Sequence, residues 1–152
     1  MSKQILAAYD DEGVFVYQAF KPSIVEAALR RGTFAEGFSF DRLTWIKPSF
    51  GWMLHRSEYA TAVRQERILK IKLRHDGFLT ILRRGVPTSY DRNRFASEHK
   101  WRRALDETDV RIQWDPDRSL RRVKLERRAI QIGMGGETVR QYVQEWMSDS
   151  KT

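Results

Sequence analysis

The sequence has no cysteine among its 152 residues. Disulfides, thiolate catalysis and cysteine-based zinc sites are therefore excluded together. Histidine is scarce as well, because the three in the chain, His55, His75 and His99, do not stand at a spacing typical of metal ligands. Asp115 and Asp117 flank a proline in a pattern more typical of a turn than of a metal loop. We therefore expect no metal site.

Long apolar runs are also missing. No segment approaches the roughly 20 apolar residues needed to span a bilayer, and the opening MSKQILAAYDDEG lacks the apolar stretch of a signal peptide. We expect no membrane partner and a cytoplasmic location. The apolar fraction of 41% is typical of a globular protein, and the length predicts a single domain over 1–152. The oligomeric state stays open.

Positive charge is abundant. Lysine and arginine number 28 against 20 acidic residues, which gives a net charge of +8, and arginine outnumbers lysine 20 to 8. Arginine makes bidentate contacts with phosphate and carboxylate groups. The charge therefore favours nucleotides, RNA, DNA or other polyanions as partners, although the codon bias of a GC-rich genome would give the same arginine excess.

Hydrophobic periodicity predicts the order of the elements. The expected strands cover 4–10, 14–20, 43–47, 67–73, 110–114, 121–126 and 129–134. The expected helices cover 22–31, 48–60, 76–85, 98–105 and 136–147. Most of 83–109 reads as a long basic surface segment, and DPDR at 115–118 as a turn. The pattern predicts an α+β fold whose sheet is mixed or mostly antiparallel, with a split sheet as an option, flanked by short helices. Strict β-α alternation is absent, which disfavours a Rossmann fold.

The stretch TWIKPSFGWMLHRS, residues 44–57, gives the main site hypothesis. Strand alternation puts Trp45 and Lys47 on one face, beside Ser49 at the start of the next helix. A cation, a hydroxyl group and a flat ring at a helix start suit a phosphate attached to a ring. The alternative is that Lys-Pro-Ser is simply good strand-to-helix turn chemistry, as at 21–23.

The helix after this turn presents two stripes. Phe50, Met53 and Leu54 are expected to face the core. The other stripe carries Trp52, His55 and Arg56, which adds ring-stacking and phosphate-binding candidates and one catalytic candidate, His55. A lone histidine is as a rule structural, and Trp beside Arg can also pack on itself.

Other candidates lie outside this stretch. Tyr17 and Gln18 stand near the end of a strand, where they can stack on a ring or bind an amide, or simply pack and be solvated. Arg42 precedes the main stretch and can bind a pyrophosphate. In IQIGMGGE, Gln131 and Glu137 are the catalytic candidates, while the glycine spacing matches no phosphate-binding motif and indicates a tight turn or a close backbone approach.

Five quoted runs carry a resemblance to a known family. They are AAYDDEGVFVYQAF, DRLTWIKPSFGWMLHRS, QERILKIKL, VRIQWDPDR and AIQIGMGGE. In this order they resemble the uncharacterised family catalogued as domain of unknown function 4291, over most of the chain. The resemblance has two departures: family members tend to carry Arg where this chain has Leu6, and 83–109 is short and divergent here. Whether Leu6 removes a ligand contact is left open by the resemblance.

A second resemblance supplies a function. VFVYQAFKPSIVEAALRRGTF is similar to the opening of ADP-ribosyltransferase-type domains, in which two strand-helix units and a late strand bearing Glu enclose an NAD cleft. It implies an ADP-ribosyltransferase-like fold with NAD as cofactor. Tyr17 and Trp45 would then hold a ring, Lys47, Ser49 and Arg42 or Arg56 the pyrophosphate, and Gln131 or Glu137 the ribose or attacking group. The usual first-strand Arg or His is missing.

Two functions therefore compete. One is an NAD-like nucleotide-binding enzyme that transfers ADP-ribose to a nucleic acid or another polyanion. The other is a non-catalytic basic module that binds nucleic acid, in which Trp52, Tyr90 and Trp101 would stack on bases. A cleft that joins Tyr17, Trp45, Lys47 and Gln131 would favour the enzyme, whereas a flat basic face would favour the module.

Overall fold

The computed structural model describes residues 5, 7–31, 34, 38–62, 64–119, 121 and 123–151. The helices are α1 (Pro22–Arg31), α2 (Phe50–Arg56), α3 (His75–Arg84), α4 (Glu98–Glu107), α5 (Gly136–Gln141) and the π-helix η1 (Tyr142–Trp146). The strands are β1 (Gly13–Phe20), β2 (Thr44–Ile46), β3 (Arg67–Arg74), β4 (Gly85–Pro87), β5 (Val110–Arg118), β6 (Lys124–Met134) and β7 (Met147–Lys151).

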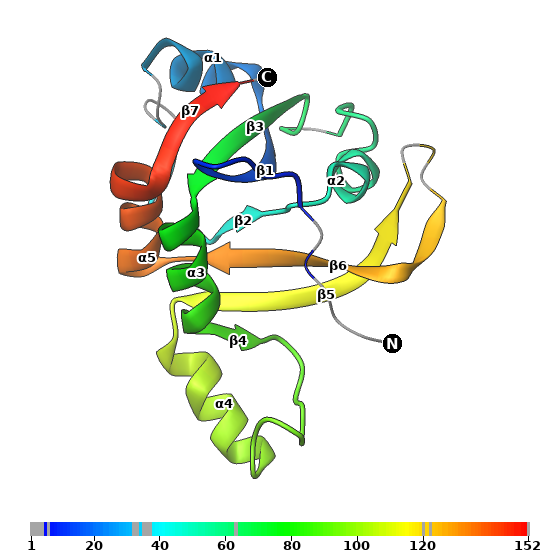
Figure 1. Ribbon diagram of the computed structural model, residues 1–152, viewed down its shortest axis with the longest axis vertical. Helices are drawn as coiled ribbons and strands as arrows, with labels where there is room; N and C mark the ends of the chain where they lie inside the picture. Colours follow the sequence, from blue (N-terminus) through cyan, green and yellow to red (C-terminus); the bar gives the residue numbers. More distant parts are fainter. Residues whose placement is uncertain are drawn as a thin grey trace.

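The strands form two sheets. A three-stranded sheet has the order β1-β3-β7 and is antiparallel, and a four-stranded sheet has the order β2-β6-β5-β4. The second sheet is mixed, because β4 runs parallel to β5 while β2, β6 and β5 are antiparallel neighbours. The two sheets lie one above the other in Figure 1. The predicted α+β fold is confirmed, and of the options left open for the sheet the structure shows a split one, with one antiparallel and one mixed part.

The two sheets meet where β1 passes the end of β2. The Tyr17 amide donates to the Lys47 carbonyl at 2.8 Å, and the Lys47 amide donates to the Tyr17 carbonyl at 3.1 Å. We call this junction the seam. Each of the two strands runs into a helix, α1 after β1 and α2 after β2, so the seam joins two strand-helix units.

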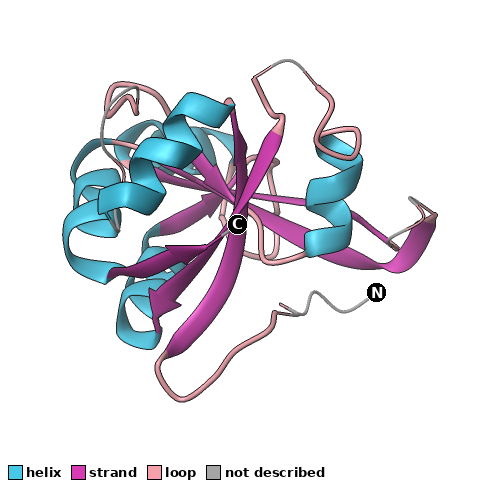
Figure 2. Cartoon of the chain, turned by 90° about the horizontal axis from the view of Figure 1, so that it is seen from above, coloured by secondary structure: helices cyan, strands magenta, loops and turns pink. Residues whose placement is uncertain are grey.

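Strict alternation gives each sheet a core face. Leu69, Ile71 and Leu73 of β3 are fully buried, and the inward residues of the four-stranded sheet join the same cluster. Burying one such side chain contributes about 1.5–3 kcal/mol. Helices α3 and α5 pack at one side of the strands, and α2 lies on the opposite side (Figures 1 and 2). The other face of the four-stranded sheet carries Trp45 together with Gln113, Asp115 and Gln131.

Several predicted boundaries need correction. The predicted DPDR turn is wrong, because β5 continues through Asp115, Pro116 and Asp117 to Arg118. Pro116 is tolerated there because the pairing shifts register between Pro116 and Arg118, and proline is compatible with such irregularities. The separate strands predicted at 121–126 and 129–134 are one strand, β6.

The predicted terminal helix over 136–147 is found over 136–146, with its second half in π-helical form. It consists of α5 and η1 and gives way to β7, which the sequence pattern did not predict. A π-helix widens the turn, and its residues Tyr142, Val143 and Trp146 are all buried against the core. The chain then leaves in an extended conformation to pair with β3.

The first predicted strand is largely absent. Ile5, Ala7, Ala8 and Asp10 are not in a strand, and Tyr9 makes one isolated pairing with Val14. Residues 1–4 and Leu6 lie outside the described part of the chain. Helix α2 is shorter than predicted, and Phe50, expected in the core, is 40% exposed.

The basic stretch 83–109 contains β4 and a longer α4 than the sequence indicated. Val86, Trp101 and Leu105 form a second, small apolar cluster there, separate from the main one. Figure 1 shows α4 at the end of the molecule, beyond the four-stranded sheet. No helix in the described part of the chain is long and apolar enough to cross a membrane.

Candidate functional site

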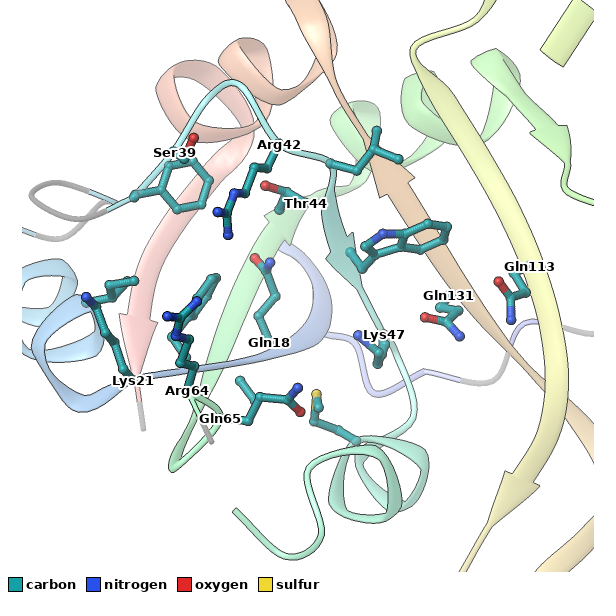
Figure 3. A pocket seen from close by; sticks show the side chains of 17 residues that line it. Gln18, Lys21, Ser39, Arg42, Thr44, Lys47, Arg64, Gln65, Gln113 and Gln131 are labelled. Carbon is teal, nitrogen blue, oxygen red and sulfur yellow. The ribbon is translucent and has the colours of Figure 1, made fainter. Parts of the chain in front are cut away.

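A cavity of about 1020 Å³ opens at the seam. Its walls come from the end of β1, from β2, from the polar face of β5 and β6, and from the segments at 38–43 and 64–65. We call it the central cavity. Its volume is that of a typical small-molecule site. Figure 3 shows Lys21, Arg42 and Arg64 toward one end of it and Gln113 and Gln131 at the other.

Gln18 reaches this cavity from the core face of β1. It follows Val14 and Val16 on the same side of the strand and is only 3% exposed. Its Oε1 accepts a hydrogen bond from the hydroxyl of Tyr142 at 2.7 Å. Tyr142 is fully buried, and burial raises its pKa well above the ordinary value. The buried phenol thus stays neutral and fixes the orientation of the Gln18 amide, whose NH₂ is the end left for a ligand.

Trp45 and Gly133 form the aromatic part of the wall. They are partners across β2 and β6. A Cβ on Gly133 would lie 2.8 Å from Cε2 and Cζ2 of Trp45, so only glycine lets the indole lie flat over β6. The close backbone approach predicted for this glycine-containing stretch is found here. The half-buried indole lines the cavity, where it can stack on a planar ring.

A hydrogen-bonded group of amides and a carboxylate closes the far end. Gln113 and Gln131 are partners across β5 and β6 and both line the cavity. The Gln131 Nε2 donates to Asp115 Oδ2 at 2.8 Å, and the Gln113 Nε2 donates to both carboxylate oxygens at 3.2 and 3.3 Å. With both NH₂ groups held by Asp115, the two amide carbonyls are the groups that can accept from a ligand.

Four cationic side chains line the cavity. Lys21, Arg42 and Arg64 are exposed at its rim, and Lys47 is 7% exposed. None of the described lining residues is Asp or Glu. A concave site with cations and no lining carboxylate concentrates anions. The arrangement suits a ligand that carries phosphate groups at one end and a ring at the other.

Tyr17 and Ser49 do not line this cavity. Tyr17 points from the opposite face of β1 and packs on Phe50, with ring centroids 5.1 Å apart. Burial raises the pKa of the Tyr17 phenol. The Ser49 hydroxyl donates to Oδ1 of the buried Asp117 at 2.5 Å. Tyr17 thus packs against α2, and Ser49 ties the start of α2 to β5.

The remaining predicted residues also lie elsewhere. His55 is half-buried in α2, and Glu137 is exposed in the first turn of α5; neither lines the cavity. The side chains of Trp52 and Arg56 lie outside the described part of the structure. The central cavity thus brings together Gln18, Arg42, Trp45, Lys47 and Gln131.

Sequence reasoning missed Lys21, Arg64, Gln65 and Gln113. The sequence does carry a signal for Gln113. VRIQWD and AIQIGM are both strand-like and contain one glutamine each, so pairing of the two strands can place Gln113 opposite Gln131. Lys21 belongs to the first Lys-Pro-Ser turn, for which the sequence favours turn chemistry over an anion site. Arg64 and Gln65 follow a segment with no periodic pattern, so no signal pointed to them.

Comparison with known families identifies the chain. A family model described as Domain of unknown function (DUF4291) matches residues 4–151. The chain belongs to this family. A search of curated proteins found no match.

Proposed function

We propose that the central cavity binds an NAD-like dinucleotide and that the protein transfers ADP-ribose from it to a nucleic acid or another polyanionic acceptor. The observation that carries the proposal is the distribution of charge, with four cations and no carboxylate among the described lining residues. Gln113 and Gln131 stand at the end opposite the three exposed cations (Figure 3), and the Trp45 indole also lines the cavity. In a dinucleotide a diphosphate joins two ring systems, and one of the rings together with the diphosphate matches this polarity.

Each part of such a ligand has a partner of suitable chemistry. Arg42, Arg64 and Lys21 supply distributed donors for a diphosphate. Trp45 supplies a flat surface for a ring. The Gln18 NH₂ can donate to a carboxamide carbonyl, and the Gln131 carbonyl can accept from a ribose hydroxyl or a carboxamide NH₂.

The transfer reaction comes from the resemblance of the sequence to ADP-ribosyltransferase-type domains. In this reaction the bond from ribose C1′ to the nicotinamide nitrogen breaks, and nicotinamide leaves neutral with the electron pair. A bond from C1′ to an acceptor oxygen forms, and that oxygen loses its proton. Two strand-helix units flanking the cavity and a late strand that contributes Gln131 support the comparison. An amide cannot take the acceptor proton, so Gln131 has a positioning role only.

The test is a thermal-shift and calorimetry series at low salt with NAD, ATP and AMP. Binding to the folded state raises its stability by mass action. We expect NAD to raise the Tm of the wild type, and Arg42→Ala and Arg64→Ala to reduce that shift. Arg83→Ala is the matched control, since Arg83 is exposed on α3 and lines none of the cavities described.

Loss of the shift in Trp45→Ala would locate the ring, provided that the variant retains its own cooperative unfolding transition. If none of these nucleotides changes the Tm or produces heat, the proposal is wrong. Steeply salt-dependent binding of nucleic acid alone would then leave the non-catalytic basic module as the better function.

A further inference from the structure

A second cavity of about 920 Å³ adjoins the central one. It lies between the loop after β4, residues 87–93, and strands β5 and β6, and we call it the loop cavity. Gln113 lines both cavities. Gln113 is therefore a wall shared by the two cavities, and its partner Gln131 faces the central cavity.

Asp115 lies at this wall on the side of the loop cavity. It lines the loop cavity and accepts hydrogen bonds from Gln113 and Gln131, which line the central cavity. Among the described residues, it is the carboxylate that touches lining residues of both. Oδ2 accepts from both glutamine amides, whereas Oδ1 accepts from Gln113 and keeps a second lone pair for a further hydrogen bond. A hydroxyl group entering the loop cavity could bind there.

The rest of the loop cavity suits a nucleotide residue of a longer chain. Arg92 and Arg128 are exposed in its lining and can contact phosphate. Its other lining carboxylate, Asp91, accepts from the Asn93 backbone amide at 2.9 Å and so serves the loop. Tyr90 and Trp114 supply aromatic surface.

Helix α4 continues this surface away from the cavity. The Tyr90 ring lies 6.1 Å from that of Trp101 on α4, and the Arg102 guanidinium lies 4.8 Å from the Trp101 ring. Lys100 and Arg103 are exposed on the same helix. A single strand could extend from the loop cavity along these cations, whereas a small free acceptor would use none of them.

We propose that the loop cavity is the acceptor site for single-stranded nucleic acid and that Asp115 takes the proton from the acceptor hydroxyl. The acceptor oxygen then forms its bond to ribose C1′ while the bond from C1′ to nicotinamide breaks. Nicotinamide leaves neutral, and the proton resides on Asp115 until solvent removes it. The reaction part of this inference rests on the proposed function, but the binding part does not.

The binding experiment uses fluorescence anisotropy with short labelled single-stranded RNA and DNA of mixed sequence. We expect Arg92→Ala with Arg128→Ala to lower the slope of log affinity against log salt by about 1.4, which is about 0.7 for each phosphate contact with a single strand. NAD binding by this double variant should equal that of the wild type. The double variant Arg42→Ala with Arg64→Ala should bind NAD more weakly than the wild type and leave the salt slope of oligonucleotide binding unchanged. Arg83→Ala with Arg30→Ala is the control of equal charge, with both residues exposed.

The reaction experiment uses Asp115→Asn, with the mass of the oligonucleotide and the release of nicotinamide as readouts. We expect the transfer rate at saturating NAD and oligonucleotide to be at least about a hundredfold lower, as for loss of a general base. Asp115→Glu should recover part of the rate. That recovery would show that the rate loss comes from removing the carboxylate and not from a change in the fold.

Two results would overturn the inference. If the Arg92 and Arg128 double variant binds the oligonucleotide with the same affinity and salt slope as the charge control, nucleic acid does not bind in the loop cavity. Transfer by Asp115→Asn at the wild-type rate removes the role of the carboxylate. If the wild type binds no dinucleotide, the proposed function fails and the proton-transfer step fails with it, while the anisotropy comparison still decides whether nucleic acid binds in the loop cavity.

Discussion

At the scale of single residues, Tyr142 has the most exacting position. It is fully buried in η1, and its hydroxyl supplies the hydrogen bond that orients Gln18. Tyr142→Phe should lower the free energy of unfolding by about 1–3 kcal/mol, because the buried Gln18 carbonyl loses its donor. Nucleotide affinity should fall with it, since the freed amide can rotate. Urea unfolding and calorimetry measure the two effects.

Tyr142→Phe should also change how the stability of the protein depends on pH. Burial raises the pKa of Tyr142 above that of the unfolded chain, which is about 10. The stabilisation from keeping the phenol neutral is complete below that value and is lost as the pH rises toward the folded pKa. Wild type should therefore lose stability faster than Tyr142→Phe above about pH 10. Parallel stability curves in alkaline urea titrations would contradict the assignment.

Gly133 permits the position of the Trp45 indole. Gly133→Ala should lower the free energy of unfolding by about 1–3 kcal/mol. The new Cβ would lie 2.8 Å from atoms of the rigid Trp45 ring, which cannot bend away as the end of a flexible side chain could. In a Trp45→Ala background the cost should nearly vanish. A double-mutant cycle by chemical denaturation measures this coupling, and equal costs in both backgrounds would count against the contact.

Individual site residues were partly predictable. Strand alternation predicts that Trp45 and Lys47 share a face, side-chain chemistry makes Gln131 a candidate, and strand pairing brings all three to one cavity. Ser49 and Tyr17 were chosen by the same reasoning but face other partners. Sequence spacing predicts which residues share a face of one strand, but it does not give the register with a partner strand that decides which face lines a cavity.

At the scale of elements, the turn after α2 is unusual. Glu58, Tyr59 and Ala60 have φ values of 53°, 59° and 62°, a left-handed conformation that costs non-glycine residues about 1–2 kcal/mol each. Ser57 holds the turn, since its buried hydroxyl donates to the Met53 carbonyl and accepts from the Ala60 amide. This turn leads to Arg64 and Gln65 at the cavity.

Ala60→Gly should therefore stabilise the protein by up to about 1 kcal/mol, because the relief of strain exceeds the entropy that glycine loses on folding. Ala62→Gly is the matched control, since Ala62 is not in the left-handed region. It should lose about 0.5–1 kcal/mol. Guanidinium denaturation compares the two, and destabilisation by both would show that Ala60 is not strained.

Elements with a clear period were predicted well, and those set by tertiary pairing were not. The strands at 14–20 and 67–73 and the helix at 22–31 carry strong local patterns and agree with β1, β3 and α1. The pattern of 136–147 is equally helical, but pairing with β3 draws Met147 and the residues after it into β7. Asp-Pro-Asp is turn-like by itself, and the pairing with β6 overrides it.

At the scale of the whole molecule, the protein has two apolar clusters of unequal size. Val86, Trp101 and Leu105 form the smaller one beneath α4, apart from the main core. Leu105→Ala should therefore speed hydrogen exchange in α4 and leave β1 and β3 largely protected. Ile71→Ala, a fully buried change in the main core, should lower global stability by about 2–5 kcal/mol. Equal loss of protection throughout the chain in both variants would show one cooperative unit.

The seam has a mechanical consequence. Hydrogen bonds between β1 and β2 in the described part of the chain are those of the Tyr17 and Lys47 backbones, far fewer than those within each sheet. A force that pulls the two sheets apart should therefore break these backbone hydrogen bonds before the longer ladders within each sheet. A ligand that contacts both Gln18 and Lys47 would bridge the two sides of the seam. The protein should therefore resist mechanical extension more strongly when the central cavity is occupied.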